Sequence, residues 1–153
     1  MKSLLMCCAV LSMASSAIAG ERVSATNFYV VKQEQIPAGN GSVFWTEDNV
    51  GTFTVKEGPI DPGFARCIGS GFGGPGGVEG DGICVYGEGE DTFTMKWKIV
   101  GVGSNEWKIV TATGKYAGMT GSGTTKTRVD AKFLKLAHRI SDWEGEINLP
   151  NQD

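Results

Sequence analysis

Apolar and polar residues alternate in several short stretches of the chain, and many of the apolar positions hold β-branched or aromatic residues. The clearest stretch runs from Asp91 to Lys98, where Phe93, Met95 and Trp97 share one face and threonines and lysines share the other. Successive side chains of a strand point to opposite faces, so this pattern predicts one buried and one solvated face. Beyond residue 20, no stretch keeps a helical period for more than about ten residues. We therefore predict a nearly all-β domain.

Nine segments are candidate strands: Val23–Gln33, Ser42–Thr46, Gly51–Glu57, Ala65–Gly71, Gly82–Gly87, Asp91–Val100, Glu106–Thr113, Gly121–Val129 and Asp142–Leu149. Turn-forming sequences lie between them, among them Glu47-Asp48-Asn49 and Asp61-Pro62-Gly63. A spacing near ten residues is typical of a sandwich or barrel. The segment Asp130–Ile140 fits both a short helix and a strand, and we expect a helical or irregular crossover there.

The first 19 residues have the three parts of a cleaved secretory signal peptide. These are the basic Lys2, the apolar run Leu4–Leu11 and the small-residue site Ala17-Ile18-Ala19. The apolar run is too short to span a bilayer. We expect cleavage after Ala19, export to the periplasm or the medium, and one domain over residues 20–153 that does not insert into a membrane.

Beyond the signal segment, the chain contains two cysteines, Cys67 and Cys84. Export to an oxidising compartment predicts that they form a disulfide. Together with the single His138 they are too few ligands for a metal site, so no metal and no cofactor are expected. The formal net charge of −3 becomes one unit more negative when Lys2 is removed, and charges of both signs are interspersed. This argues against nucleic acid as a partner.

Glycines surround an aromatic residue in the segment Thr111–Thr124 (TATGKYAGMTGSGT). Gly114, Gly118 and Gly121 permit a left-handed or closely packed backbone. Tyr116 can fold its ring over such a turn and direct its hydroxyl group to a backbone atom. We predict that this motif is structural.

The same segment resembles the signature turn of the allene oxide cyclase and dirigent-like barrel superfamily, where a T-G-x-[FY]-x-G-x-x-G pattern joins two late strands. Small exported bacterial proteins of that superfamily are similar in three further features. These are a Cys-Gly segment (Cys67-Ile68-Gly69), a glycine-rich hairpin returning to a second cysteine (Gly80–Cys84) and a closing strand (Trp143–Pro150). The resemblance implies a single antiparallel, calycin-like barrel of eight strands, and an association into dimers or trimers. Closure of a barrel removes exposed sheet edges.

The resemblance does not extend to the cyclase active site. In the plant cyclases an acid and an amide on the first strand contribute to that site, whereas Asn27–Gln35 (NFYVVKQEQ) has a different order. If Tyr29-Val30 aligns with the corresponding aromatic pair, Lys32 occupies the position of the acid. Cyclase activity is therefore not implied.

The interior of an eight-stranded barrel is filled by side chains or holds one small ligand. Our first hypothesis is an exported, non-enzymatic barrel that binds a small hydrophobic or aromatic molecule. The glycine-rich hairpin Gly69–Gly82 would act as a lid; it lacks the Gly-Lys-Ser/Thr ending of a phosphate loop. The residues expected to line the site are Tyr29, Trp45, Phe53, Phe93, Trp97 and Trp107.

Two alternatives remain open. One is a cofactor-free cyclase, isomerase or dirigent-like enzyme, which needs a polar group inside the barrel. The candidates are Lys32, Glu34 and Tyr86, and the sequence has no nucleophile-elbow pattern. The other alternative is an oligomeric structural or interaction module.

Overall fold

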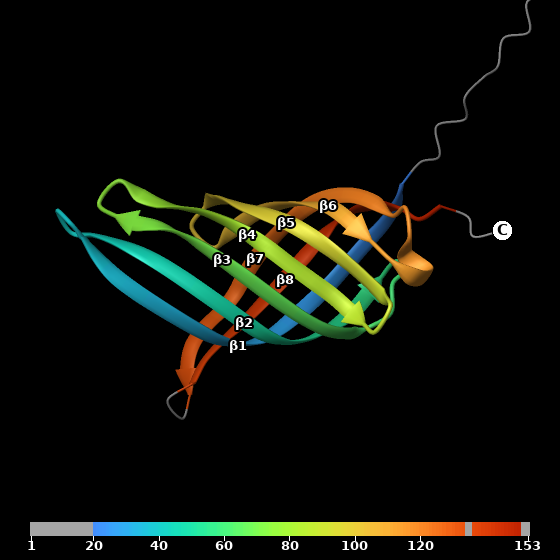
Figure 1. Cartoon of the computed structure of the whole chain (residues 1–153), viewed down its shortest axis with the longest axis horizontal. Coiled ribbons are helices and arrows are strands. Elements are labelled where there is room, and N and C mark those ends of the chain that lie inside the picture. Colours follow the sequence, from blue (N-terminus) through green and yellow to red (C-terminus); the bar gives the residue numbers. More distant parts are fainter. Residues whose placement is uncertain (1–19, 134–135, 151–153) are drawn as a thin grey trace, which may run out of the picture.

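The computed structural model describes residues 20–133 and 136–150; the segment predicted to be a signal peptide lies outside this part of the chain. Among the described residues, no helix is long and apolar enough to cross a membrane. The described residues form eight strands and one short 3-10 helix (Figure 1). Their bounds are β1 (Glu21–Gly39), β2 (Ser42–Glu57), β3 (Gly63–Gly74), β4 (Gly77–Glu88), β5 (Asp91–Gly101), β6 (Ser104–Ala112), η1 (Gly114–Tyr116), β7 (Thr120–Phe133) and β8 (Leu136–Asn148).

The strands form one closed antiparallel barrel in sequence order. Each strand pairs with the next, and β8 closes the barrel by pairing with β1, from Glu21 opposite Ile147 to Val31 opposite Ala137. The barrel is elongated, and both ends of the described chain lie at the same end of it (Figure 1). The predicted all-β, eight-stranded barrel is confirmed.

The turn expected at Glu47-Asp48-Asn49 is absent, because β2 runs without interruption through these residues. Glu47 and Asn49 are buried and line cavities inside the barrel, whereas Asp48 forms an exposed ion pair with Arg66. The alternation therefore continues through residues that commonly form turns. Two of the nine candidate strands are in fact one strand.

The crossover expected near residues 130–140 is also wrong in its described part. Residues 130–133 belong to β7 and residues 136–140 to β8, and the two strands pair directly, with Asp130 opposite Arg139. Residues 134 and 135 lie outside the described residues. An ion pair between Asp130 and Arg139 connects these extended strands.

The end of the barrel near the termini is filled by apolar side chains. The largest fully buried residues are Trp143, Phe53, Phe93, Ile147 and Val23. Helix η1 places the buried Tyr116 edge-on against Phe93, with ring centroids 5.4 Å apart. The Tyr116 hydroxyl accepts a hydrogen bond from the backbone N–H of Asp61 at 3.0 Å. Gly114 and Gly118 have φ of +55° and +79°, a left-handed backbone conformation that glycine adopts readily.

Tryptophan side chains cover three pairs of glycines that face each other across neighbouring strands. Trp97 covers Gly69 and Gly82, Trp45 covers Gly71 and Gly80, and Trp107 covers Gly123 and Gly145. A Cβ atom at Gly82 would lie 2.6 Å from Cζ2 of Trp97, and one at Gly71 would lie 2.6 Å from Cζ2 of Trp45. The glycines therefore provide room for indole rings inside the barrel.

The glycine-rich hairpin of β3 and β4 is part of the barrel wall. Strand β3 pairs with β2 from Phe53 opposite Gly63 to Val43 opposite Gly73, and it pairs with β4 up to Gly74 opposite Gly77. The segment expected to be a flexible lid is thus a regular pair of strands, held on one side by β2. The disulfide joins Cys67 and Cys84 at directly opposed positions of this pair, which confirms the predicted bond.

Candidate functional site

The end of the barrel away from the termini opens into a cavity of about 330 Å³, which we call the mouth. One part of its wall is apolar, formed by Trp45, Trp97, Ile99, Val43 and Val78. The polar part comes from Gln33 and Gln35 on β1, Glu47 on β2, Asn105 on β6, Thr127 and Asp130 on β7, and Arg139 on β8. The mouth therefore combines a flat aromatic surface with hydrogen-bonding groups.

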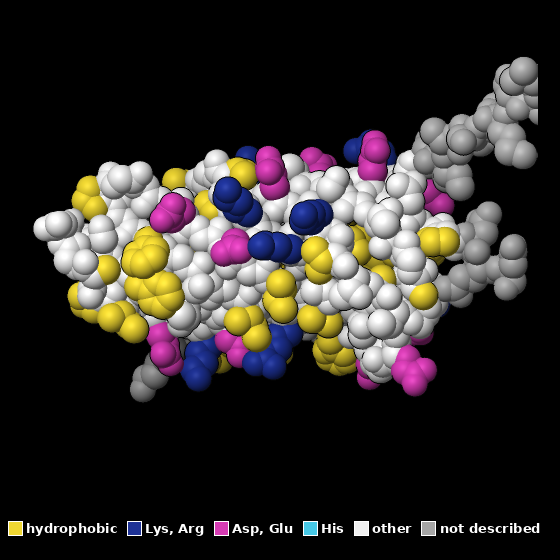
Figure 2. All heavy atoms as spheres, turned by 45° about the horizontal axis from the view of Figure 1, so that its top comes forward, with side chains coloured by type: hydrophobic (Ala, Val, Ile, Leu, Met, Phe, Trp, Pro, Cys, Tyr) yellow, Lys and Arg dark blue, Asp and Glu magenta, His cyan; other side chains and the backbone are white. Residues whose placement is uncertain are grey.

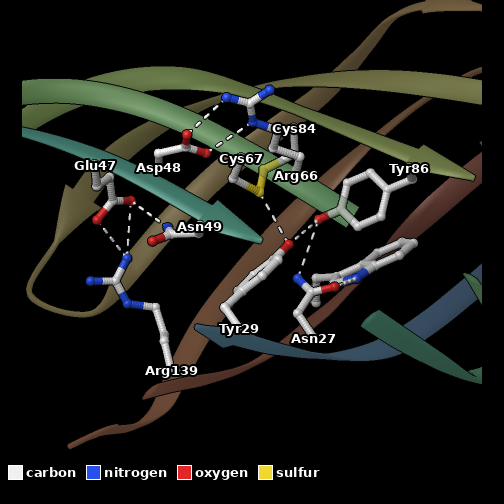
Figure 3. Close-up of a disulfide and its surroundings, with 11 residues drawn as sticks. Asn27, Tyr29, Glu47, Asp48, Asn49, Arg66, Cys67, Cys84, Tyr86 and Arg139 are labelled. Atoms are coloured by element: carbon white, nitrogen blue, oxygen red, sulfur yellow. Dashed lines mark hydrogen bonds and ion pairs between the residues drawn. A yellow bond between two sulfur atoms is a disulfide. The ribbon is translucent and has the colours of Figure 1, made fainter. Parts of the chain in front are cut away.

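A buried ion pair forms the floor of the mouth. Nη1 of Arg139 donates hydrogen bonds to both carboxylate oxygens of Glu47, at 3.0 and 2.8 Å, and the Asn49 amide donates to Oε1 of Glu47 at 2.9 Å. Nη2 of Arg139 donates to Asp130 at 3.1 Å. Figure 3 shows Glu47, Asn49 and Arg139 directed toward one another. The side chains of Glu47 and Arg139 are only 7% and 19% exposed.

Burial alone lowers the pKa of Arg139, but the charges and hydrogen bonds of Glu47 and Asp130 outweigh it and raise the pKa above its ordinary value. The guanidinium group is therefore always charged. Its charge is balanced within the barrel rather than by solvent, as a buried cation requires.

Three buried polar atoms around this ion pair have no hydrogen-bond partner among the described residues. They are the donors Nε1 of Trp45 and Nε of Arg139, and the acceptor Oδ1 of Asn49. Buried polar atoms in native proteins nearly always have a partner, which is often water or a ligand when it is not protein. The two donors belong to residues that line the mouth, whereas Asn49 lines only the deeper cavity described next.

A second, smaller cavity of about 50 Å³ lies deeper in the barrel. It shares Glu47, Trp97, Asn105, Thr127 and Arg139 with the mouth, so the ion pair separates the two spaces. The other side chains around it include Tyr29, Tyr86, Met95, Trp107 and the disulfide. A volume of this size holds water molecules but no organic ligand.

A chain of hydrogen bonds runs along one wall of the deeper cavity (Figure 3). The Trp143 indole donates to Oδ1 of Asn27 at 3.2 Å, and Nδ2 of Asn27 donates to the Tyr86 hydroxyl at 3.2 Å. The Tyr86 and Tyr29 oxygens are 3.4 Å apart, and the Tyr29 oxygen is 3.1 Å from Sγ of Cys67. A disulfide sulfur carries no hydrogen, so Tyr29 donates to Cys67 and Tyr86 donates to Tyr29.

Both tyrosines of this chain stay protonated at neutral pH. Burial, together with the neighbouring Tyr86, raises the pKa of Tyr29 well above 10.0. Burial also raises the pKa of Tyr86, although its hydrogen bonds with Tyr29 and Asn27 act in the opposite direction. The two hydroxyl groups therefore act as hydrogen-bond donors and not as bases.

The aromatic residues expected to line a site divide into three sets. Trp45 and Trp97 line the mouth, and Tyr29, Trp97 and Trp107 line the deeper cavity. Phe53 and Phe93 line neither space, because they pack against each other and against Tyr86 at the closed end. These two residues belong to the core.

Of the three candidates for a polar group inside the barrel, the structure places one there. Tyr86 is buried and lines the deeper cavity. Lys32 and Glu34 are exposed and alternate with the inward-facing Val31, Gln33 and Gln35, so both lie on the outer face of β1. The expectation that they point inward is wrong, because the register of β1 assigns the odd positions to the interior.

Sequence reasoning missed the central polar residues Glu47, Asn49 and Arg139. A signal was present in β2, where every second residue belongs to the same face of the strand. These residues are Trp45, Glu47, Asn49, Gly51 and Phe53. The same period runs through Ala137, Arg139, Ser141 and Trp143 in β8. The polar members of each series interrupt the apolar pattern and so conceal the alternation in the sequence.

Comparison with known proteins identifies no family for this chain. No protein-family model matches it, and neither does any curated protein. Among solved structures, a similar chain is the pterocarpan synthase dirigent protein GePTS1. That match has 14% sequence identity and a TM-score of 0.49, and it covers 90% of this chain and 96% of that chain. The assignment of the barrel rests on the strand pairing described above.

Proposed function

We propose that this chain is an exported barrel protein that binds a small, mainly hydrophobic or aromatic molecule in its mouth without converting it. The mouth, at about 330 Å³, lies within the range of roughly 300 to 1,000 Å³ that is common for small-molecule sites. Its mixture of an apolar wall with a few convergent polar groups is also common in such sites. These features support binding of a molecule with a flat apolar body and one polar head.

The observation that carries this proposal is the environment of Trp45. Its indole ring forms part of the apolar wall, and its Nε1–H is buried without a partner among the described residues. An unsatisfied buried donor costs about 1 to 3 kcal/mol. A ligand that stacks on the ring and turns it so that Nε1 donates to the ligand would recover this free energy, so Trp45 would contribute both affinity and orientation.

Binding can be tested by isothermal titration calorimetry with naphthalen-2-ylmethanol, which has a flat apolar body and a hydroxyl head. Val78 lines the mouth and is 40% exposed. Val129 on β7 is 39% exposed and does not line the mouth; it precedes Asp130 by one position, and its partner Ile140 follows Arg139 by one position. We expect saturable binding by the wild-type protein, its loss in Val78→Arg and its retention in Val129→Arg. Absence of binding to the wild type, or equal binding by both variants, would contradict the proposal.

Export remains part of the proposal and is supported by the cysteines. Cys67 and Cys84 are bonded in the barrel wall, and such structural disulfides persist mainly in oxidising compartments. The signal-like sequence of residues 1–19 is consistent with that location.

A second candidate function is cofactor-free catalysis in the same mouth, as in a cyclase, an isomerase or a dirigent-like enzyme. The observation in its favour is Glu47, a buried carboxylate at the floor of a cavity large enough for an organic molecule. A buried carboxylate is a common general acid or base. Mass spectrometry of a bound candidate substrate over time distinguishes the two functions, since a binding protein returns it unchanged. Turnover that is lost in Glu47→Gln would favour the enzyme.

A third candidate is self-association through an apolar outer face. In Figure 2, apolar side chains gather in the left and lower part of the visible face, next to lysine and arginine side chains at its centre. Seven of the exposed apolar residues of β1 to β4 adjoin one another through their strand pairing, and they are Phe28, Val30, Val50, Phe64, Ile68, Ile83 and Val85. Asp48 and Arg66 lie among them and pair with each other.

A second copy of this chain is the occupant that suits this outer face. A two-fold axis that passes between Asp48 and Arg66 would bring Asp48 of each copy near Arg66 of the other, so the charges of the two copies would be complementary in that arrangement. Native mass spectrometry should show dimers that are lost in Val50→Lys and kept in Val110→Lys, a similarly exposed position on β6. A strictly monomeric wild type contradicts this candidate.

A further inference from the structure

The positive and negative charges of the side chains around the mouth do not cancel. Among the described residues that line it, the charged ones are Glu47, Asp130 and Arg139, and the other polar ones are neutral. Two carboxylates against one guanidinium leave an excess of one negative charge. No lysine of the described chain lines this cavity.

The one cation is also already engaged. Arg139 donates from Nη1 to both oxygens of Glu47 and from Nη2 to Asp130. An entering carboxylate would therefore meet a guanidinium that two carboxylates neutralise, and it would be repelled by both of them. Inside a barrel these charges are screened less than at an open surface.

The unpartnered atoms of residues that line the mouth are both donors. Nε1 of Trp45 and Nε of Arg139 need acceptors, whereas Asn49, whose Oδ1 needs a donor, lines only the deeper cavity. The oxygen of an alcohol, a phenol or an amide supplies an acceptor without placing a further negative charge beside Glu47 and Asp130. Two aromatic faces, Trp45 and Trp97, line the same space and attract cations rather than anions.

We infer that the mouth selects ligands with a neutral or cationic polar head, such as an alcohol, a phenol, an amide or an amine, and discriminates against carboxylates and other anions. This inference rests on the proposed function, since it specifies the ligand of the same cavity. It separates this site from a fatty-acid site, where a cation normally receives the carboxylate.

Three probes with one apolar body test the selectivity by calorimetry at neutral pH. They are naphthalen-2-ylmethanol, naphthalen-2-ylmethylammonium and naphthalene-2-carboxylate. Both ions lose hydration when they bind, so the difference between their affinities mainly reports the sign of the charge in the mouth. We expect the alcohol and the ammonium ion each to bind at least about tenfold more tightly than the carboxylate at low salt, and the difference to shrink as salt is added.

A charge-neutralising variant provides the second test. Asp130 is 53% exposed at the mouth, and Asp81 is 56% exposed on β4, where it pairs with Lys96 and does not line the mouth. Asp130→Asn should reduce the preference for the ammonium ion over the carboxylate several-fold, and Asp81→Asn should leave it unchanged.

The outcomes distinguish this inference from the function on which it rests. Carboxylate binding as tight as that of the ammonium ion, or an equal effect of the two variants, overturns the charge selectivity while ligand binding stands. Failure of all three probes to bind contradicts the proposed function as well.

Discussion

Glu47 on β2 and Arg139 on β8 form a doubly hydrogen-bonded ion pair inside the barrel, although their strands are not neighbours in the sheet. Strand β1 lies between β2 and β8 and pairs with both. The ion pair thus connects two strands that share no backbone ladder. It also separates the mouth from the deeper cavity.

Removing one partner of this pair should destabilise the fold strongly. Glu47→Ala leaves the charge of Arg139 buried with only the exposed Asp130 beside it, so we expect a loss of about 3 to 5 kcal/mol in the free energy of unfolding. Chemical denaturation followed by circular dichroism measures this quantity. The control is Asp48→Ala, which removes the exposed ion pair with Arg66 on the outer face and should cost far less. Equal losses in both variants would show that the internal pair has no special role.

The pairing of glycines with tryptophans predicts a specific rescue. The Cβ atom of Gly69→Ala would overlap the indole ring of Trp97, so we expect a loss of about 1 to 3 kcal/mol from overpacking. In Gly69→Ala combined with Trp97→Leu, the loss should be smaller than the sum of the two single losses, because the overlap is gone. Gly73→Ala is the control, since its Cβ atom would lie no closer than 3.8 Å to any neighbour. Additive losses at Gly69 and Trp97 would argue against the contact.

Reduction of the disulfide should weaken the barrel without changing its topology. The bond joins cysteines 17 residues apart, and closing a loop of that length contributes about 3 kcal/mol in the chain-entropy model. Thermal unfolding with and without a reductant measures the effect. The double variant Cys67→Ala/Cys84→Ala should unfold at one temperature under both conditions. Two titratable thiols in native protein that has lost residues 1–19 would contradict the bond.

Alkaline pH should destabilise the protein through Tyr29 and Tyr86. Their pKa values are raised in the folded state above 10.0, chiefly by burial, so the folded state holds protons that the unfolded state releases. The stability linked to these groups is fully present below pH 10 and is lost as pH rises through the folded pKa values. Absorbance at 295 nm should show both tyrosines ionising together with unfolding. Their ionisation near pH 10 in a protein that remains folded would refute the prediction.

Export should remove the first 19 residues. When the full chain is produced in a bacterial host with an intact secretion pathway, the mass of the exported protein should correspond to a start at Gly20. Ala19→Arg places a large cation at the cleavage site and should leave the signal segment attached. A cytoplasmic product with the uncut mass of the wild-type chain would contradict export.

The features of the fold that could be predicted from the sequence are those that depend on residues close together in the chain or on the number of residues of one type. The alternation of Phe93, Met95 and Trp97 determines which face of β5 is buried, and glycines at positive φ allow the turn around Tyr116. The disulfide followed from the number of cysteines and the expected compartment. Each of these inferences depends on local geometry or on a count.

The candidate site depends on strand register, which local patterns do not contain. Glu47 and Arg139 are 92 residues apart, and nothing near either residue shows that the other neutralises it. An acidic residue followed by Asp48 and Asn49 therefore has the composition of a turn. Likewise, the glycines of β3 and β4 indicate flexibility until their register places each pair beneath an indole ring.

Closure between the first and the last strand has a consequence for how the chain folds. Until β8 is available, β1 lacks one of its two partners, and its backbone donors and acceptors on that side cannot be satisfied by any earlier strand. We expect folding to be slow and cooperative, because its defining contacts join the two ends of the chain. During synthesis the barrel cannot close before β8 emerges. This delay suits the proposed export, because a chain that is not yet compact can cross a membrane.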